Sequence, residues 1–261
     1  MLKYYFKRFF YLFLPPIFTK YLLKKTPSLK KKNIIKLSEN ENINFIKYNK
    51  ESIFEIHNTQ LRYFGGLGFN KISHPFLKFL LGNKEDMTDF YNTHEPKNIF
   101  ECHKLDIDKT YSEQKFLNDP EGSLPWLHYN DQCSDNIEGN LKAIDGRQQF
   151  GPISDKKLNF EIDRLNKVVV SIRDKGFTPE KYEGYPRGYF MQNNDGKWVF
   201  YIVGGSHRVA ALISLNYEYV PVILQPKYPN IVLENDINNW PKIKDNKITN
   251  SNALKIFLSY F

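Results

Sequence analysis

The chain has 261 residues, of which 41% are hydrophobic and 16% aromatic, so it can bury a substantial core and is not a disordered protein. The formal net charge is +8, but the ten charged residues that precede Glu39 are all lysines or arginines. Without them, 27 basic residues remain against 29 acidic ones, so the body of the protein is close to neutral.

Residues 1–38 are a basic, aromatic leader. Its apolar core, Phe9–Phe18, is shorter than the roughly 20 residues that a spanning helix needs, and Pro15-Pro16 interrupts it. No small-residue cleavage site follows, which argues against a signal peptide. Aromatic rings interleaved with lysines in residues 1–36 favour a segment that lies on an anionic membrane surface. A terminal helix packed on the body is the alternative.

Cysteine usage indicates the compartment. Cys102 and Cys133 form no CxxC pair, so the sequence predicts neither a disulfide framework nor a zinc site, and both thiols are expected in the core. A reducing cytoplasm follows as the expected location. Together with the leader, this predicts a cytoplasmic protein that is peripheral to the inner face of the membrane.

Residues 39–144 are an amino-terminal elaboration with little regular pattern. The stretch "LRYFGGLGFNKISHPFLKFLLG" is interpreted as a glycine turn before a short buried helix, because no clear strand leads into it. Residues 117–132 are expected to be a turn-rich surface segment that holds Trp126 and His128. We expect the elaboration to cover a functional site, since a site on a small α/β domain would lack walls that exclude water.

A clear order of elements begins near residue 145. Leu165, Val168, Val169 and Ile172 have the spacing of an amphipathic helix that ends at Gly176. The stretches "YPRGYFMQ" and "KWVFYIV" predict a β-hairpin across the "NNDGK" turn. A glycine turn, a helix ending at Asn216 and the strand "YEYVPVIL" follow. The prediction is an α+β fold with a mixed sheet.

The turn "GGSHR" is the strongest candidate site. Gly204 and Gly205 permit positive φ and close approach of a ligand to the backbone. Ser206 is expected to be the N-cap, so that the first N–H groups of the helix face the ligand. His207 and Arg208 add donors that suit a phosphate or a carboxylate. The alternative is a tight turn with a packed histidine and a surface arginine.

The helix, hairpin, glycine turn, helix and "VPV" strand of residues 145–226 resemble the ParB/sulfiredoxin-like superfamily, and "GGSHR" is most similar to the sulfiredoxin turn. The resemblance implies that Gly205, Ser206, His207 and Arg208 contact the phosphates of ATP or another nucleotide. Mg²⁺ is expected with the nucleotide, because phosphoryl transfer usually needs a divalent metal to neutralise charge. Ser206 stands where sulfiredoxin has its reactive cysteine, and a hydroxyl cannot perform thiol redox chemistry. Sulfinic-acid reduction is therefore disfavoured.

Other residues near the turn are candidates for catalysis. Arg147, in "DGRQQFGPIS", is predicted to be a second phosphate clamp; a loop arginine paired with Asp145 is the alternative. His207, Asp145 and Glu161 are the candidate catalytic groups, because phosphoryl transfer needs a group that orients the attacking oxygen. Glu161 also has the spacing of a structural ion pair with Arg164. The sequence does not identify a metal-ligand set.

Residues 227–261 are a carboxy-terminal extension whose final helix is expected to pack through Leu254, Phe257, Leu258 and Phe261. Lys255 is its only charge from Ser251 onward, so a DNA-groove reader is disfavoured.

Three functions remain open. The first is a kinase-like, nucleotide-dependent phosphotransferase or a nucleotide hydrolase at the cytoplasmic membrane face, acting on an envelope glycan or lipid precursor. The second is a non-catalytic nucleotide-binding switch or adaptor that uses the final helix as its partner surface. The third is a ParB-like nucleic-acid-binding protein whose leader contacts phosphates. The sequence favours the first.

Overall fold

The computed structural model describes residues 33–39, 41–106, 116–117, 119–128, 136–137, 141–181 and 184–261. Residues Ile34–Phe261 form one compact unit. Its fold is α+β with a mixed seven-stranded sheet, in agreement with the predicted class. None of the helices in these ranges is long and apolar enough to cross a membrane.

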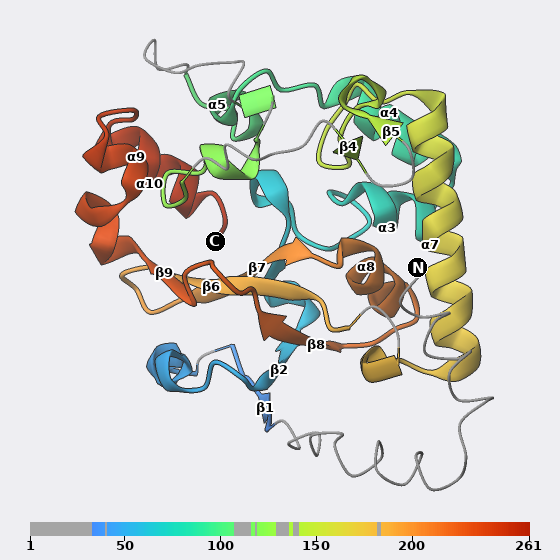
Figure 1. Ribbon diagram of the computed structural model, residues 1–261, viewed down its shortest axis with the longest axis horizontal. Helices are drawn as coiled ribbons and strands as arrows, with labels where there is room; N and C mark the ends of the chain where they lie inside the picture. Colours follow the sequence, from blue (N-terminus) through green and yellow to red (C-terminus); the bar gives the residue numbers. More distant parts are fainter. Residues whose placement is uncertain are drawn as a thin grey trace, which may run out of the picture. The chain divides into compact units, whose positions relative to one another are not determined.

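The sheet has the strand order β1-β2-β8-β6-β7-β3 (Figure 1). Strand β6 pairs antiparallel with β7, and its other edge pairs parallel with β8 and then with β9. Both β1 with β2 and β3 with β7 are parallel pairs, whereas β2 and β8 are antiparallel. The strands of this sheet are β1 (Ile34–Lys36), β2 (Ile53–His57), β3 (Leu61–Arg62), β6 (Arg187–Gln192), β7 (Trp198–Gly204), β8 (Tyr219–Leu224) and β9 (Ile231–Leu233). Strands β4 (Asn136–Ile137) and β5 (Leu141–Lys142) form a separate pair.

Helices pack on this sheet and on one another, and α8 lies against α7 and α3 (Figure 1). The α-helices are α3 (Pro75–Leu80), α4 (Lys84–Thr93), α5 (Ile99–Cys102), α7 (Asp155–Lys175), α8 (Ser206–Ser214), α9 (Pro241–Lys244) and α10 (Asn250–Leu258).

The predicted helix, hairpin, helix and strand of residues 145–226 are confirmed as α7, β6–β7, α8 and β8. Helix α7 begins at the N-cap Ser154, whose hydroxyl accepts from Lys157 N–H, and ends at Gly176 with φ of 71°. The short helix predicted after the "FGGLG" turn is also present, as α3.

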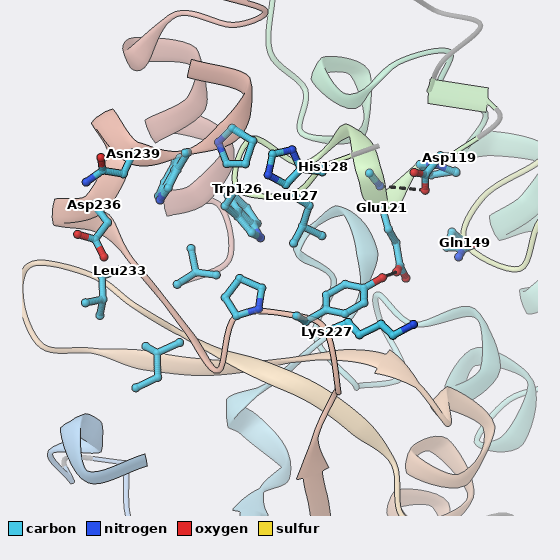
Figure 2. Close-up of a pocket in the computed structure, with 18 of the residues that line it drawn as sticks. Asp119, Glu121, Trp126, Leu127, His128, Gln149, Lys227, Leu233, Asp236 and Asn239 are labelled. Atoms are coloured by element: carbon cyan, nitrogen blue, oxygen red, sulfur yellow. Dashed lines mark hydrogen bonds between the residues drawn. The ribbon is translucent and has the colours of Figure 1, made fainter. Parts of the chain in front are cut away.

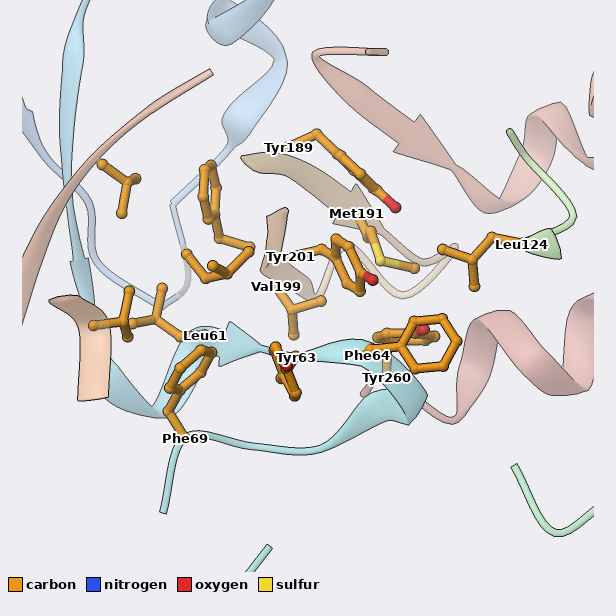
Figure 3. Close-up of a cluster of buried hydrophobic side chains, with 14 of the residues drawn as sticks. Leu61, Tyr63, Phe64, Phe69, Leu124, Tyr189, Met191, Val199, Tyr201 and Tyr260 are labelled. Carbon is orange, nitrogen blue, oxygen red and sulfur yellow. The ribbon is translucent and has the colours of Figure 1, made fainter. Parts of the chain in front are cut away.

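The core of the sheet is rich in tyrosine. Figure 3 shows Tyr63, Tyr189, Tyr201 and Tyr260 among the buried side chains of this region. The rings of Tyr189 and Tyr201 stack with centroids 5.1 Å apart, and Tyr201 meets Tyr260 at 5.7 Å. Tyr260 follows α10, so this residue joins the end of the chain to the central strands.

One packing prediction is wrong in part and another is wrong. Phe257 of α10 is buried and Phe261 packs against the core, as predicted, but Leu258 is 42% exposed, and the rest of the buried face of α10 consists of Ala253 and Ile256. Residues 122–127 are buried rather than on the surface, and Trp126 is only 3% exposed because it packs against Trp240 and Phe257.

The amino-terminal prediction remains open. Residues 1–32 lie outside the described part of the chain, so the leader's membrane contact stays a prediction. The first strand begins at Ile34 and pairs with β2, which means that residues 34–36 of the predicted basic segment belong to the sheet. Cys102 is buried as expected, and Cys133 lies outside the described residues.

Candidate functional site

A cavity of about 430 Å³ opens beside the "GGSHR" turn. The loop at residues 147–149, helix α7, the start of β6 and the turn at residues 203–208 line it. Its lining includes five basic side chains and His207, and none of the described residues that line it is acidic. We call it the cationic cavity. Its five basic side chains are those of Arg147, Lys157, Arg164, Arg187 and Arg208.

The glycine turn differs from the prediction in two details. Gly204 is the last residue of β7 and its φ is not positive, so only Gly205 adopts the positive φ that both glycines permit. Gly205 has φ of 86° and is itself the N-cap of α8, whereas Ser206 is the first helical residue. The first backbone bonds of the helix run from Arg208 N–H and Val209 N–H to the Gly205 carbonyl. The N–H groups that precede them belong to the positive end of the helix dipole.

Three guanidinium groups are positioned around this turn. A Cβ built on Gly204 would lie 3.7 Å from Nε and Nη2 of Arg187, so the Arg187 side chain lies beside that glycine. Arg208 folds back over Gly205 and donates from Nη1 to the Gly184 carbonyl. Arg147 donates from Nε to the Leu117 carbonyl at 2.8 Å. The structure therefore brings the predicted clamp, Arg147, to the same cavity as the turn.

A buried network of three polar or charged side chains includes His207 of the turn. His207 Nε2 and Lys157 Nζ both contact the Glu161 carboxylate, the lysine at 2.5 Å. The three residues are only 5%, 3% and 1% exposed, in the order His207, Lys157 and Glu161. The His207 ring also packs on Phe76, with centroids 4.4 Å apart. Glu161 of α7 thus pairs with Lys157, one helical turn before it, and with His207 of α8.

The proton positions in this network follow from burial and charge. Burial lowers the pKa of His207, and the opposing effect of its hydrogen bond to Glu161 is smaller. Burial raises the pKa of Glu161, but His207 and Lys157 together outweigh it and the net pKa is lowered. Glu161 is therefore ionised and His207 neutral at pH 7. Since a carboxylate only accepts, Nε2 of His207 carries the proton and Nδ1 carries a lone pair.

Asp145 is separate from this network. Its carboxylate accepts from the Lys142 N–H and from the Ser154 hydroxyl, both at 2.9 Å. The hydrogen bonds from the Lys142 backbone and from the Ser154 hydroxyl lower the pKa of Asp145. Asp145 does not line the cationic cavity. Asp145, which was predicted to be catalytic, instead stabilises the loop before α7 through these two hydrogen bonds.

The sequence analysis missed three cations of the cavity. Lys157 and Arg164 lie on the same face of α7 as Glu161, four residues before it and three after it, so helical spacing contained the signal. Arg187 pairs with Gly204 across the hairpin. Counting back from the Asp195-Gly196 turn would have placed Arg187 opposite Val203, next to the glycines, and a register shift between Arg187 and Gly188 moves it opposite Gly204.

Replacing Gly205 by Ala is expected to destabilise the turn. Its φ of 86° disfavours any side chain, and the new Cβ would lie 2.8 Å from Arg208 Nη2 and 3.0 Å from Pro186 Cα. We expect a loss of about 1–3 kcal/mol in the free energy of unfolding, measured by urea denaturation. Gly204→Ala is the matched control, because nothing lies closer than 3.7 Å there. Equal losses in the two variants would contradict this account of the turn.

No protein-family model matches the chain, and no curated protein is significantly similar to it in sequence. The chemistry of the site therefore rests on its geometry. Concentrated positive charge, a helix amino end and an uncharged imidazole together suit an anionic ligand that carries phosphate groups.

Proposed function

We propose that the cationic cavity binds the phosphates of a nucleotide and that the protein is a nucleotide-dependent phosphotransferase or hydrolase. The observation that supports this most is the cavity's charge: four arginines and no acid among its described lining residues, with the fifth basic group, Lys157, paired with Glu161 behind the wall. A polyphosphate offers several negative oxygens, and guanidinium groups bind such oxygens through paired hydrogen bonds. The resemblance of residues 145–226 to nucleotide-binding proteins agrees with this proposal.

His207 is the proposed proton acceptor. The acceptor hydroxyl or a water attacks the terminal phosphorus, the bond to the bridging oxygen breaks, and the proton moves to Nδ1 of His207. Glu161 positions the ring through Nε2 and stabilises the imidazolium that forms. Lys157 keeps the carboxylate ionised before the step. The arginines of the cavity stabilise the charge of the transferring group.

Magnesium requires oxygen ligands, and the cavity's donor set is poor in them. None of its described lining residues is Asp or Glu, and the described chain has no cluster of three or more His, Cys, Asp or Glu that could hold a metal ion. Mg²⁺ is usually bound by one or two carboxylates together with substrate phosphates. None of the described lining residues therefore offers a carboxylate to the predicted Mg²⁺, which stays a prediction, and we assign charge neutralisation in the cavity to the guanidinium groups.

Nucleotide binding is tested by thermal stability with ATP, ADP, CTP and GTP, with and without magnesium. A nucleotide at one hundred times its Kd stabilises the folded state by about 2.7 kcal/mol, which raises the Tm by roughly 5–10 °C for a chain of this size. In Arg187→Gln, we expect the affinity to fall roughly 10- to 150-fold, because a charge-assisted hydrogen bond is lost. Arg173→Gln removes an exposed cation of α7 outside the cavity and is the matched control.

A nucleotide-binding switch without turnover is the second candidate. It is favoured by the same lack of a carboxylate among the described lining residues, since phosphoryl transfer commonly uses one to orient the attacking oxygen. A Tm rise without release of ADP or phosphate would select the switch. No Tm rise with any of the four nucleotides would overturn both candidates.

A further inference from the structure

A second, larger cavity of about 1190 Å³ adjoins the cationic cavity. Three segments line it: residues 119–128, residues 227–233 around β9, and residues 236–241 before α9. Figure 2 shows Glu121 and Trp126 on one wall of this cavity, and Lys227 below them. All three segments lie outside residues 145–226. We call this space the acceptor cavity.

The acceptor cavity shares two lining residues, Arg147 and Gln149, with the cationic cavity. Between them lies Gln148, whose carbonyl accepts hydrogen bonds from the hydroxyls of Tyr63 and Tyr91 at 3.2 and 3.0 Å. Both tyrosines are buried, so the shared wall is held by the core. A molecule in the acceptor cavity can therefore reach the phosphate site along the Arg147 side.

The walls of the acceptor cavity combine aromatic rings with carboxyl groups. Trp126 and Trp240 meet edge to face with centroids 5.4 Å apart, and the Trp126 indole donates to the Tyr189 hydroxyl. Both rings are largely buried, at 3% and 4% exposure, so they contribute small apolar areas of fixed orientation to the wall. The acids are Asp119, Glu121 and Asp236. Such walls suit a neutral molecule with apolar C–H faces and many hydroxyls, because each hydroxyl both donates and accepts.

Glu121 is the best placed of these acids. The Tyr228 hydroxyl lies 3.4 Å from its Oε2, and Asp119 Oδ1 accepts from the Gly122 N–H (Figure 2). Burial, and then the negative charge of Asp119, raises the pKa of Glu121 to about 8. At neutral pH its carboxyl is therefore mostly protonated and can donate to a ligand hydroxyl as well as accept from one.

The nucleoside of a bound nucleotide has a different place to occupy. A cavity of about 260 Å³ shares Arg164 and Arg208 with the cationic cavity. Its other lining residues include Val168, Ile172 and Phe177, so it is mainly apolar. The acceptor cavity shares a different pair of residues, Arg147 and Gln149, with the cationic cavity. The apolar cavity and the acceptor cavity therefore adjoin the phosphate site through different residues.

We propose that the acceptor cavity binds the molecule that receives the phosphoryl group, and that this acceptor is a neutral, polyhydroxylated compound of the sugar class. This inference rests on the proposed function. Glu121 and the aromatic rings bind and orient the acceptor, and Arg147 lies where its reacting hydroxyl approaches the phosphate.

The experiment measures sugar binding without nucleotide, by tryptophan fluorescence. The probes are glucose, galactose, mannose, N-acetylglucosamine and N-acetylgalactosamine, titrated to tens of millimolar. At least one is expected to change the emission of Trp126 and Trp240. Glu121→Leu is expected to weaken its binding roughly tenfold or more, because the hydroxyl loses its partner. Glu121→Gln, which keeps a donor and an acceptor, is expected to retain most of the affinity.

Glu51→Leu is the control, since Glu51 is exposed and lines none of these cavities. If no sugar of the panel binds, or if Glu121→Leu binds as well as the parent, the acceptor assignment is overturned. Should nucleotides bind while no sugar does, the acceptor inference alone fails. Sugar binding without any nucleotide binding would instead support sugars as ligands of this cavity and overturn their role as phosphoryl acceptors.

Discussion

Glu161→Gln is expected to lower the free energy of unfolding by about 3–5 kcal/mol, because it leaves the Lys157 ammonium buried without a counter-charge. The Lys157 side chain is only 4% exposed, so water cannot replace the lost carboxylate. His207 keeps a neutral amide as a partner and is affected less. Urea denaturation at pH 7 measures the change.

The double variant Lys157→Met/Glu161→Gln is the control for this effect. It removes both charges and leaves a site of similar volume, and replacing a buried ion pair by neutral groups is often nearly neutral in stability. We therefore expect the double variant to unfold with a free energy closer to that of the parent than the single variant does. If both variants lost the same stability, the cost would come from packing and not from an uncompensated charge.

His207→Gln is expected to lower turnover by about 10²–10⁴-fold, the usual contribution of a general base, while nucleotide still raises the Tm. Glutamine can donate to Glu161 but cannot accept the proton of the attacking oxygen. Release of ADP or phosphate at saturating nucleotide measures the effect. His57→Gln is the matched control, because His57 lies on β2 and does not line the cationic cavity.

The pH dependence of the parent gives a second readout. The pKa of His207 is lowered from 6.5 by burial, so the base form dominates at pH 7. Turnover should be constant around neutrality and fall as the pH drops through the lowered pKa, below 6.5. A variant that retains full turnover without His207 would assign the base to another group. A rate that rises steadily above pH 7 would contradict a lowered pKa.

Local signals explain why residues 145–226 were predictable. The Asp-Gly turn, the glycine at the end of α7 and the helical spacing of its apolar residues each act over a few positions. The amino-terminal strands lack such signals. Strand β3 has two residues and is defined by its pairing with β7, which is far along the chain; β1 has three residues and is defined by its pairing with β2. No short window of sequence contains that information.

The residues of the candidate site also fall into those that a short stretch of sequence reveals and those that it does not. The "GGSHR" turn was identified from five consecutive residues. Arg164 and Arg187 were not, because their role depends on how α7 and β6 meet the turn. The burial of Trp126 was missed for a similar reason: its segment has many turn residues, but its ring meets Trp240, which is far along the chain.

The sheet order also has a consequence for synthesis of the chain. Phe54 of β2 pairs with Val222 of β8, and Leu61 of β3 pairs with Phe200 of β7. These pairings close very long loops, which slows folding, and β2 cannot gain its β8 partner until residues 219–224 have left the ribosome. During translation, β2 therefore remains unpaired with β8 until residues 219–224 have been synthesised. We conclude that the sheet cannot be completed before β8 has been synthesised, and that a fragment released before that point would be aggregation-prone.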